Sequence, residues 1–237
     1  MSYEFIKTER QGNILIVTMN RPEVYNAVHA EMHQEMSDCW DAFAADPDLW
    51  VAVLTGAGNK AFTAGNDLKA TAKGGSKKTL AATGFAGLSS RFDLEKPIIA
   101  ADTAKFALPE VKVGFFASAS GVQRLSRYIG RLAAQELMLS GRTIDAAEAL
   151  RLGCVNEVVP ADQLMERAME KATELAGVSP SSIKATKRIL NSMAVADGLP
   201  ESLNYSREVQ MDLAQTEDFK EGVKAFVEKR APKWVNR

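Results

Sequence analysis

The amino-acid sequence predicts an α/β protein, in which a β/α core is followed by a helical C-terminal region. Apolar, β-branched runs alternate with helical periodicity in the N-terminal half, and helical patterns dominate after Ser120. The 237 residues, 46% of them apolar and 25% charged, have the composition of a globular protein. This length suffices for one domain, or one domain with an extension, around a single core.

The chain starts with a predicted β-hairpin followed by a helix. Tyr3–Glu9 alternates between apolar and polar residues, Gln11–Asn13 forms the turn, and Ile14–Met19 is apolar and β-branched until Pro22 ends the strand. From Val28 onward, apolar residues return at steps of three and four, which predicts a helix with one buried face. The residues of that face are Met32, Met36, Cys39, Trp40 and Phe43.

The next segments predict further strands and a loop. Trp50–Gly58 is an apolar run that ends in glycines, typical of a buried strand that leads into a tight turn. Residues 70–82 are small, basic and interrupted by glycine, which favours a mobile surface loop. The sequences PIIA (97–100) and AKFAL (104–108) predict two short strands. These elements begin with a β-α-β order.

Helical patterns follow, interrupted by one predicted strand. Helices are expected over Val122–Ile129, Leu132–Leu139 and Ala146–Leu152, and Gly153 is expected to cap the last of them. CVNEVV (154–159) predicts a strand that the following proline ends. Four helical stretches are expected from residue 161 to the C-terminus.

Charge and hydropathy exclude several classes of function. The formal net charge is −1 and the basic residues are scattered, so neither a nucleic acid nor an anionic membrane is an expected partner. No apolar stretch is long enough to predict a membrane span. Cys39 and Cys154 lie far apart in apolar runs, which favours buried thiols in a reducing compartment. The N-terminus has no targeting pattern, so we expect a cytoplasmic protein.

Two motifs match cofactor sites poorly. His29 and His33 lie one helical turn apart in HAEMH, but the zincin order places glutamate directly after the first histidine. We therefore expect no metal and a solvated helix face. Gly56 and Gly58 fit the loose G-x-G-x-x-A dinucleotide pattern, but no amphipathic helix follows them. A turn is expected there, whereas an NAD-dependent dehydrogenase would predict NADH binding.

Two other segments are stronger candidates for chemistry. In AFTAGNDLKA (61–70), small residues allow a ligand to approach the backbone, and a helix beginning near Asn66 would direct free N–H groups at an anion or oxyanion. An ordinary strand-to-helix turn fits this segment equally well. Glu110 in FALPEVKVG stands among apolar residues, and a desolvated carboxylate there suits general acid-base chemistry. The more common role of such a residue is a cap or a salt bridge.

Six sequence blocks resemble one known family, the enoyl-CoA hydratase (crotonase) family, with members such as short-chain hydratases and carnitinyl-CoA dehydratases. The blocks are RPEVYNAV, AFTAGNDLK, FALPEVKVG, GVQRLSRYIG, SGRTIDAAEALRLGCVNEVVP and FVEKRAPKW, in order over nearly the whole chain. The resemblance implies a spiral of β-β-α turns over residues 1–177 and a helical trimerisation region over residues 178–237. It also implies an acyl-CoA thioester substrate with no further cofactor, and a homotrimer or a dimer of trimers.

The resemblance implies roles for particular residues. The backbone N–H of Asn66 is expected to bind the thioester oxygen as it becomes an enolate, and Glu110 to be one of two catalytic glutamates. The residues that match the CoA groove of the family are Val24, Ala27, Ala64, Asn66, Asp67, Leu68 and Lys69. Phe226 and Lys229 match C-terminal residues that contact CoA, often across a subunit boundary.

The resemblance breaks between Ala100 and Ala101. Relatives continue there into a glycine-rich turn, a helix with the second catalytic glutamate, and another strand. Roughly twenty residues, enough for the crossover helix that parallel strands need, have no counterpart here, and the second oxyanion donor is missing with them. Three explanations fit: residues omitted from this sequence, a true deletion, or a specialised member with one glutamate. We favour the first two.

We therefore expect hydration of an enoyl-CoA, or the reverse dehydration, impaired by the missing segment. Loss of one oxyanion donor typically costs about 3 kcal/mol of transition-state stabilisation. Loss of a general acid or base slows a reaction by a further factor of about 10² to 10⁴. The alternatives are an enoyl-CoA isomerase that uses one glutamate and a non-catalytic CoA-binding subunit.

Overall fold

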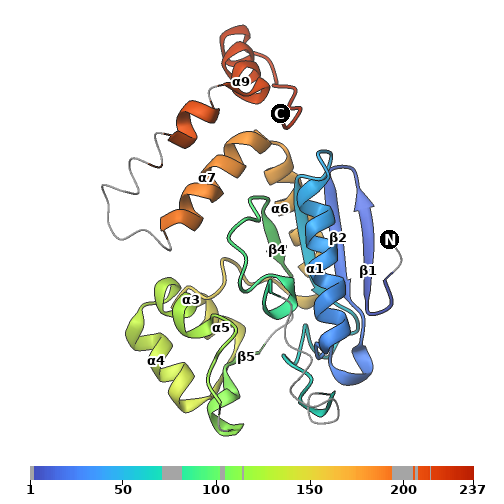
Figure 1. The fold of residues 1–237 in the computed structure, drawn as a ribbon, viewed down its shortest axis with the longest axis vertical. Helices are drawn as coiled ribbons and strands as arrows, with labels where there is room; N and C mark the ends of the chain where they lie inside the picture. The colour runs from blue at the N-terminus through green and yellow to red at the C-terminus, as the bar shows by residue number, and fades with distance from the viewer. Residues whose placement is uncertain are drawn as a thin grey trace.

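A four-stranded sheet forms the centre of the protein (Figure 1). The computed structural model describes residues 3–70, 82–101, 105–113, 115–193, 205, 208–213 and 215–237. The strands are β1 (Ile6–Gln11), β2 (Ile14–Met19), β3 (Val51–Gly56) and β4 (Ile98–Ala100), and the sheet has the order β1-β2-β3-β4. The β1–β2 pair is antiparallel and the other two pairs are parallel. The predicted hairpin and β-α-β order are confirmed.

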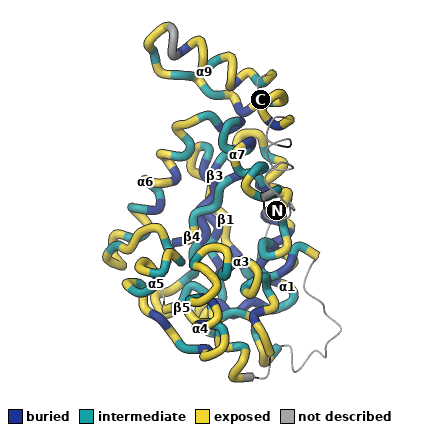
Figure 2. The backbone as a smooth tube through the Cα atoms, turned by 90° about the vertical axis from the view of Figure 1, so that its left-hand side faces the viewer, coloured by how far each residue is buried: buried dark blue, intermediate teal, exposed yellow. Residues whose placement is uncertain are grey.

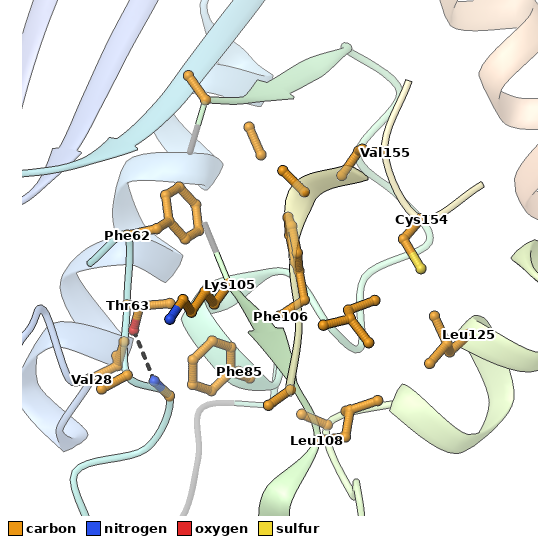
Figure 3. A pocket seen from close by; sticks show the side chains of 18 of the residues that line it. Val28, Phe62, Thr63, Phe85, Lys105, Phe106, Leu108, Leu125, Cys154 and Val155 are labelled. Atoms are coloured by element: carbon orange, nitrogen blue, oxygen red, sulfur yellow. Dashed lines mark hydrogen bonds between the residues drawn. The ribbon is translucent and has the colours of Figure 1, made fainter. Parts of the chain in front are cut away.

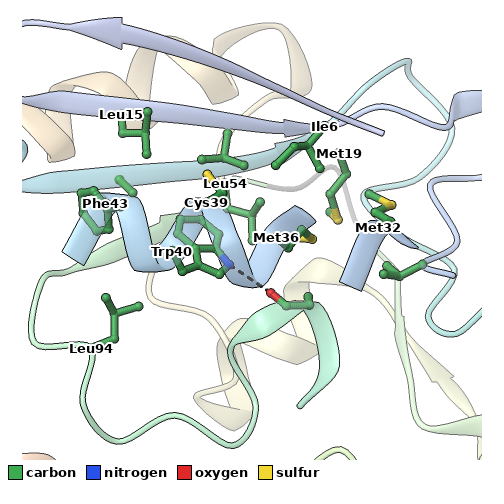
Figure 4. Packing of buried hydrophobic residues seen from close by; sticks show 14 of the residues in the cluster. Ile6, Leu15, Met19, Met32, Met36, Cys39, Trp40, Phe43, Leu54 and Leu94 are labelled. Atoms are coloured by element: carbon green, nitrogen blue, oxygen red, sulfur yellow. Dashed lines mark hydrogen bonds between the residues drawn. The ribbon is translucent and has the colours of Figure 1, made fainter. Parts of the chain in front are cut away.

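Helix α1 (Ala30–Ala45) connects β2 to β3 and covers one face of the sheet (Figure 4). The five apolar residues expected on its inner face are all buried. Among them, Trp40 is fully buried, and its Nε1 donates to the carbonyl of Ala86 at 3.0 Å. Ala86 belongs to a short 3₁₀ helix, η2 (Phe85–Gly87), which is thereby fixed against α1.

Helix α6 (Leu164–Ala176) covers the opposite face of the sheet. Successive side chains of a strand point to opposite faces, so Ile14 and Ile16 pack with α6 whereas Leu15 and Val17 pack with α1. Burial on both faces explains why β2 and β3 read as continuous apolar runs rather than as alternating ones.

After β4 the chain leaves the sheet. β5 (Phe106–Ala107) pairs antiparallel with β6 (Thr143–Ile144) in a separate two-stranded sheet. β4 is therefore the edge strand of the central sheet in the described part of the chain, and its outer edge has no strand partner there. β4 ends at Ala100, directly before the position where the resemblance predicts that a crossover helix is missing.

Three helices and the second sheet form a lobe beside the central sheet (Figure 1). The helices are α3 (Gly121–Tyr128), α4 (Arg131–Ser140) and α5 (Ala146–Leu152), as the sequence predicts. Gly153 closes α5 in the left-handed conformation, with φ +82°. The strand predicted over residues 154–159 is wrong, because this apolar segment has no strand beside it to pair with and instead lines a cavity. The loop predicted over residues 70–82 lies almost wholly outside the described residues.

The C-terminal region is helical, as predicted. Besides α6, it contains α7 (Pro180–Met193), helical residues 208–213 and α9 (Glu217–Glu228). The buried Asp218 accepts hydrogen bonds from Ser181 on α7 and from the N–H groups of Val235 and Asn236, which ties the end of the chain to α7. Figure 2 shows burial concentrated in the central sheet and α1. No described helix is both long and apolar enough to cross a bilayer.

Lys96, which is buried, and Lys187, which is partly buried, join the C-terminal end of α1 to α7. Lys96 is 3% exposed, and its Nζ donates to the carbonyls of Phe43 and Asp46, the C-terminal end that favours a cation. Lys187 on α7 donates to the carbonyl of Lys96 at 2.5 Å. Burial lowers the pKa of each lysine to about 8, and for Lys96 the charge of Lys184 contributes further.

We expect the free energy of unfolding to rise between pH 8 and pH 10.5. In this window the unfolded chain, with lysine pKa values near 10.5, binds more protons than the folded chain does, so raising the pH favours the folded state. Lys96→Met should reduce that rise by about 1–3 kcal/mol, whereas Lys7→Met on the exposed side of β1 should leave it unchanged. Urea unfolding at several pH values measures both. An unchanged slope in Lys96→Met would contradict the assignment.

Candidate functional site

A large cavity lies between the central sheet and the lobe of α3, α4 and α5. Its volume is about 2520 Å³, and it extends from the loop after β3 to helices α3 and α6. Figure 3 shows Val28, Phe62 and Thr63 on one side and Leu125 and Cys154 on the other. Because ligand pockets usually measure about 300–1,000 Å³, this cavity has room for a large ligand.

The loop after β3 presents a free backbone amide to the cavity. Val28 forms a parallel bridge with Asn66, in which its N–H donates to the carbonyl of Gly65 (2.8 Å) and its carbonyl accepts from the N–H of Asp67 (3.0 Å). In such a bridge the N–H of Asn66 itself faces away from Val28. It has no acceptor among the described residues, and Asn66 lines the cavity. The segment can therefore donate a hydrogen bond to a ligand.

Asp67 fixes the start of the helix that follows at residues 68–70. Its Oδ1 accepts from the N–H of Ala70 (3.0 Å), and its Oδ2 pairs with Arg21 (3.1 Å). The Ala70 hydrogen bond, together with the bond and charge of Arg21, lowers the pKa of Asp67. Gly65, with φ +83°, supplies the backbone conformation that this turn requires. The helix start that the sequence predicts is confirmed.

His33 connects α1 to the free amide. Its Nδ1 accepts from the N–H of Ala86 (3.0 Å) and therefore carries no proton, so Nε2 is the protonated nitrogen of the neutral ring and donates to Oδ1 of Asn66 (3.0 Å). Burial lowers the pKa of His33, which favours this neutral form. The side chain of Asn66 is thereby held against α1 while its backbone amide faces the cavity.

The solvated helix face predicted for the two histidines is wrong. His33 is 4% exposed, and His29 lies at the N-cap of α1, where its ring packs edge-on against Phe5 at 4.3 Å. The sequence prediction did not include the burial of His29 and His33, because the segment HAEMH reads as a polar part of the helix. The spacing could have indicated that His33 is buried. His33 precedes Met36 by three residues and Trp40 by seven, which places it at the edge of the apolar face of the helix.

Glu110 contributes a carboxylate to the cavity wall. It lies in a 3₁₀ helix, η3 (Pro109–Val113), directly after β5. One of its oxygens, Oε2, is buried without a hydrogen-bond partner, and no ion pair joins Glu110 to a described residue. The expected shielding from water is confirmed for this oxygen, and the salt-bridge alternative is not supported.

Two of the three buried side-chain atoms without a partner in the described chain belong to this cavity: Oε2 of Glu110 and Nδ1 of His29. Buried polar atoms are rarely left unpaired in native proteins. Their concentration here indicates that a ligand or water supplies the missing partners. Glu157 and Glu174 also line the cavity, but they are paired with Arg167 and Lys171, respectively.

The structure brings together only some of the predicted site residues. Ala64, Asn66, Leu68 and Glu110 line the cavity. Val24, Ala27, Asp67, Lys69 and Lys229 are not among its lining residues. Ala27 is buried and Asp67 is engaged as a cap, which explains their absence from the wall. Lys229 follows α9, at the end of the molecule remote from α3 and α4 (Figure 1), and the side chain of Phe226 lies outside the described part.

The dinucleotide pattern after β3 corresponds to a turn, as expected. No helix opens at residues 56–61, so no row of helical amides faces a pyrophosphate there. Gly56 is instead required by packing, since a Cβ would lie 2.4 Å from the carbonyl oxygen of Phe62. Among the described residues, no group of three or more His, Cys, Asp or Glu side chains could hold a metal ion.

A family model matches nearly the whole chain in two pieces. The model described as "Enoyl-CoA hydratase/isomerase" matches residues 9–101 and 96–237. The two pieces overlap at residues 96–101, a range that includes β4, the last strand of the central sheet.

Individual proteins are similar over their full lengths. The chain is 37% identical to a "Probable enoyl-CoA hydratase" of Mycobacterium bovis over 259 aligned positions that cover 100% of both. It is 38% identical to a "Carnitinyl-CoA dehydratase" of Citrobacter koseri over 260 positions, with 99% of both covered. Since this chain has 237 residues, at least 22 of those 259 positions have no residue here.

Solved structures share the fold. An enoyl-CoA hydratase from Mycobacterium tuberculosis superimposes with a TM-score of 0.90 at 31% identity, covering 98% of this chain and 99% of that one. A probable enoyl-CoA hydratase/isomerase from Mycobacterium abscessus gives 0.90 at 34% identity, with 100% of both covered. The fold expected from the sequence is confirmed.

Proposed function

Because this chain belongs to the enoyl-CoA hydratase/isomerase family, we propose that it is a hydro-lyase that adds water across the 2,3 double bond of an enoyl-CoA or removes it in the reverse reaction. One observation carries the proposal. The N–H of Asn66 and the buried Oε2 of Glu110, neither of which has a hydrogen-bond partner among the described residues, belong to residues that line the same cavity. A thioester oxygen and a transferable proton are the partners that these two groups lack.

Asn66 is assigned to the thioester oxygen. When the oxygen of water bonds to C3, the electrons of the double bond move through C2 to the thioester carbonyl, whose oxygen becomes an enolate. An N–H group already directed at this position stabilises the negative charge without reorganising. The His33 bond to the Asn66 side chain supports that fixed orientation.

Glu110 is assigned to one of the two proton transfers. Hydration removes a proton from the attacking water and delivers a proton to C2, so that H and OH are added overall. A carboxylate with one shielded oxygen suits either step. The second transfer requires another group that can give or take a proton. In the described cavity wall, the carboxylates of Glu157 and Glu174 are already paired with basic side chains.

Coenzyme A is proposed as part of the substrate, with no other cofactor. Ala64 and Leu68 lie at the same end of the cavity as Asn66, which supports a CoA site there. Lys229 follows α9, which lies far from α3 and α4 in the same chain, so we propose that a neighbouring subunit supplies Phe226 and Lys229 in a homotrimer or a dimer of trimers. We also propose a cytoplasmic location.

We propose that the segment between Ala100 and Ala101 is absent from this chain. The free edge of β4, the two-piece family match and the 22 unmatched positions support this. The absent residues include the second oxyanion donor and the second glutamate, so reduced activity is expected. The division into residues 1–177 and 178–237 is part of the same proposal. The intact mass of the natural protein, compared with 25.7 kDa for this chain, tests it.

An enoyl-CoA isomerase is the second candidate. One carboxylate that moves a proton between C2 and C4 suffices for that reaction, and Glu110 is the cavity carboxylate whose buried oxygen is unpaired. Parallel assays of crotonyl-CoA hydration and 3-enoyl-CoA isomerisation separate the two reactions. Hydration in the first assay supports the lyase, and product in the second alone supports the isomerase. CoA-ester binding without either reaction leaves the non-catalytic subunit.

A further inference from the structure

The peptide that carries the N–H of Asn66 follows a glycine and is held at its other end. In a trans peptide, the carbonyl of Gly65 and the N–H of Asn66 point in opposite directions. The Gly65 carbonyl accepts from the N–H of Val28 (2.8 Å), and this bond also sets the direction of the Asn66 N–H. Gly65, with φ +83°, is free to adopt many other backbone conformations. The direction of the amide therefore depends on further bonds that fix the backbone at Gly65.

The hydroxyl of Thr63 supplies such a bond. Its hydrogen is donated to the carbonyl of Asn26 (2.7 Å), which leaves a lone pair to accept from the N–H of Gly65 (3.1 Å). Figure 3 shows the bond that the Thr63 hydroxyl accepts. Thr63 thereby joins the segment before α1 to the glycine next to Asn66.

The side chain of Asn26 anchors both ends of the loop after β3. It has no exposed surface, and its Oδ1 accepts from the N–H of Arg21 (3.0 Å). Its Nδ2 donates to the carbonyls of Ala57 (2.9 Å) and Ala61 (2.8 Å). A Cβ on Gly56 would lie 2.8 Å from this Nδ2, so the glycine leaves the room that the amide occupies. Asn26 thus fixes the loop through its side chain and Thr63 through its carbonyl.

The position of Asn26 favours asparagine for two physical reasons. Its φ is +53°, a left-handed conformation that asparagine adopts more readily than most residues with a Cβ. Its side chain must also accept one hydrogen bond and donate two, which a primary amide can do. Aspartate has nearly the same shape but, when ionised, has no hydrogen to donate to the two carbonyls.

We propose that Asn26 and Thr63 form a clamp that positions the Asn66 amide for the thioester oxygen. The inference rests on the proposed function, because the amide has this role only if an acyl-CoA thioester is the ligand. Both are positioning residues, since they act through the backbone of the loop. A displaced amide weakens stabilisation of the enolate more than binding of the thioester, because the charge on the oxygen develops during the reaction.

The absorbance of bound para-dimethylaminocinnamoyl-CoA tests the position of the amide. A hydrogen bond to its thioester oxygen draws electrons from the amino group towards the carbonyl and moves the absorbance to longer wavelength. Thr63→Val keeps the shape of threonine without the hydroxyl, so we expect the loss of about half of this shift or more, with a dissociation constant within about threefold of the parent. The kcat of crotonyl-CoA hydration should fall about tenfold or more. Thr63→Ser keeps the hydroxyl and should restore most of the shift.

Two further variants separate positioning from simple stability. Ser181→Ala removes a buried hydroxyl that bonds to Asp218 (2.9 Å) in the C-terminal region. It should lower the urea midpoint, as Thr63→Val does, but leave the absorbance shift unchanged. Asn26→Asp should lose the shift as Thr63→Val does, and the double variant should lose little more, since both residues belong to one clamp. Circular dichroism confirms that each variant is folded, and the two Thr63 variants decide the test if Asn26→Asp does not fold.

The outcomes distinguish the clamp from the proposed function. A full shift in Thr63→Val, or equal losses in Thr63→Val and Thr63→Ser, would overturn the inference and leave the proposed function intact. Failure of the parent to bind the thioester, or binding without a shift, would overturn the inference together with the assignment of Asn66. A parent shift that Thr63→Val loses, without any hydration of crotonyl-CoA, would support the clamp and overturn the lyase.

Discussion

The Glu110→Gln variant is expected to lose about 10²- to 10⁴-fold in the rate of crotonyl-CoA hydration while it keeps its affinity for CoA thioesters. Glutamine has nearly the shape of glutamate but cannot take up or deliver a proton in this reaction. The loss should therefore appear in kcat and not in the dissociation constant. Stopped-flow absorbance of the enoyl thioester and calorimetric binding of butyryl-CoA measure the two quantities.

Glu157 provides the matched control for this variant. It lines the same cavity but is exposed at the rim and bonded to Arg167 at 2.7 Å. Glu157→Gln removes the same charge from the same cavity, so a general electrostatic effect would appear in both variants. We expect the hydration rate of Glu157→Gln to lie within about twofold of the parent rate, because exposed ion pairs contribute little free energy. A parent-like rate in Glu110→Gln would exclude Glu110 from the proton transfers.

The His33→Leu variant is expected to lower kcat about 10- to 100-fold and to destabilise the fold by about 1–3 kcal/mol. Leucine leaves the N–H of Ala86 and Oδ1 of Asn66 without partners, and the loop that carries the Asn66 amide loses its link to α1. His33 acts here as a positioning residue. Its loss should change kcat more than the binding of butyryl-CoA, and urea unfolding reports the stability.

Two further variants separate positioning from simple stability. Glutamine offers one acceptor and one donor, so His33→Gln can keep both hydrogen bonds and should restore much of the rate. Asn66→Ala removes the other end of the same bond but keeps the backbone amide. The effects of His33→Leu and Asn66→Ala on kcat should then be far from additive. Full additivity would show that the His33–Asn66 bond does not transmit the effect.

Local patterns determined most of the central sheet and its covering helix. The three- and four-residue spacing from Met32 to Phe43 is the period of a helix, and the apolar runs of β2 and β3 are short and rich in β-branched residues, which favours buried strands. The positions of Gly153 and the helix at residues 68–70 followed from capping chemistry in the same way. The strand predicted over residues 154–159 is wrong, because an apolar run does not reveal whether a neighbouring strand exists to pair with it.

The sequence by itself determined the family of this protein and most elements of its fold, because these are properties of order and spacing along one chain. Only the tertiary structure decided how the groups around the cavity are arranged. It turned the N–H of Asn66 away from Val28 and joined His33 to Asn66 across 33 residues. It also buried Oε2 of Glu110 without a partner in the part of the chain that the structure describes, and it left two hydrophobic clusters facing one cavity. Each of these depends on which groups distant segments bring within hydrogen-bonding or packing distance, and no local period records that.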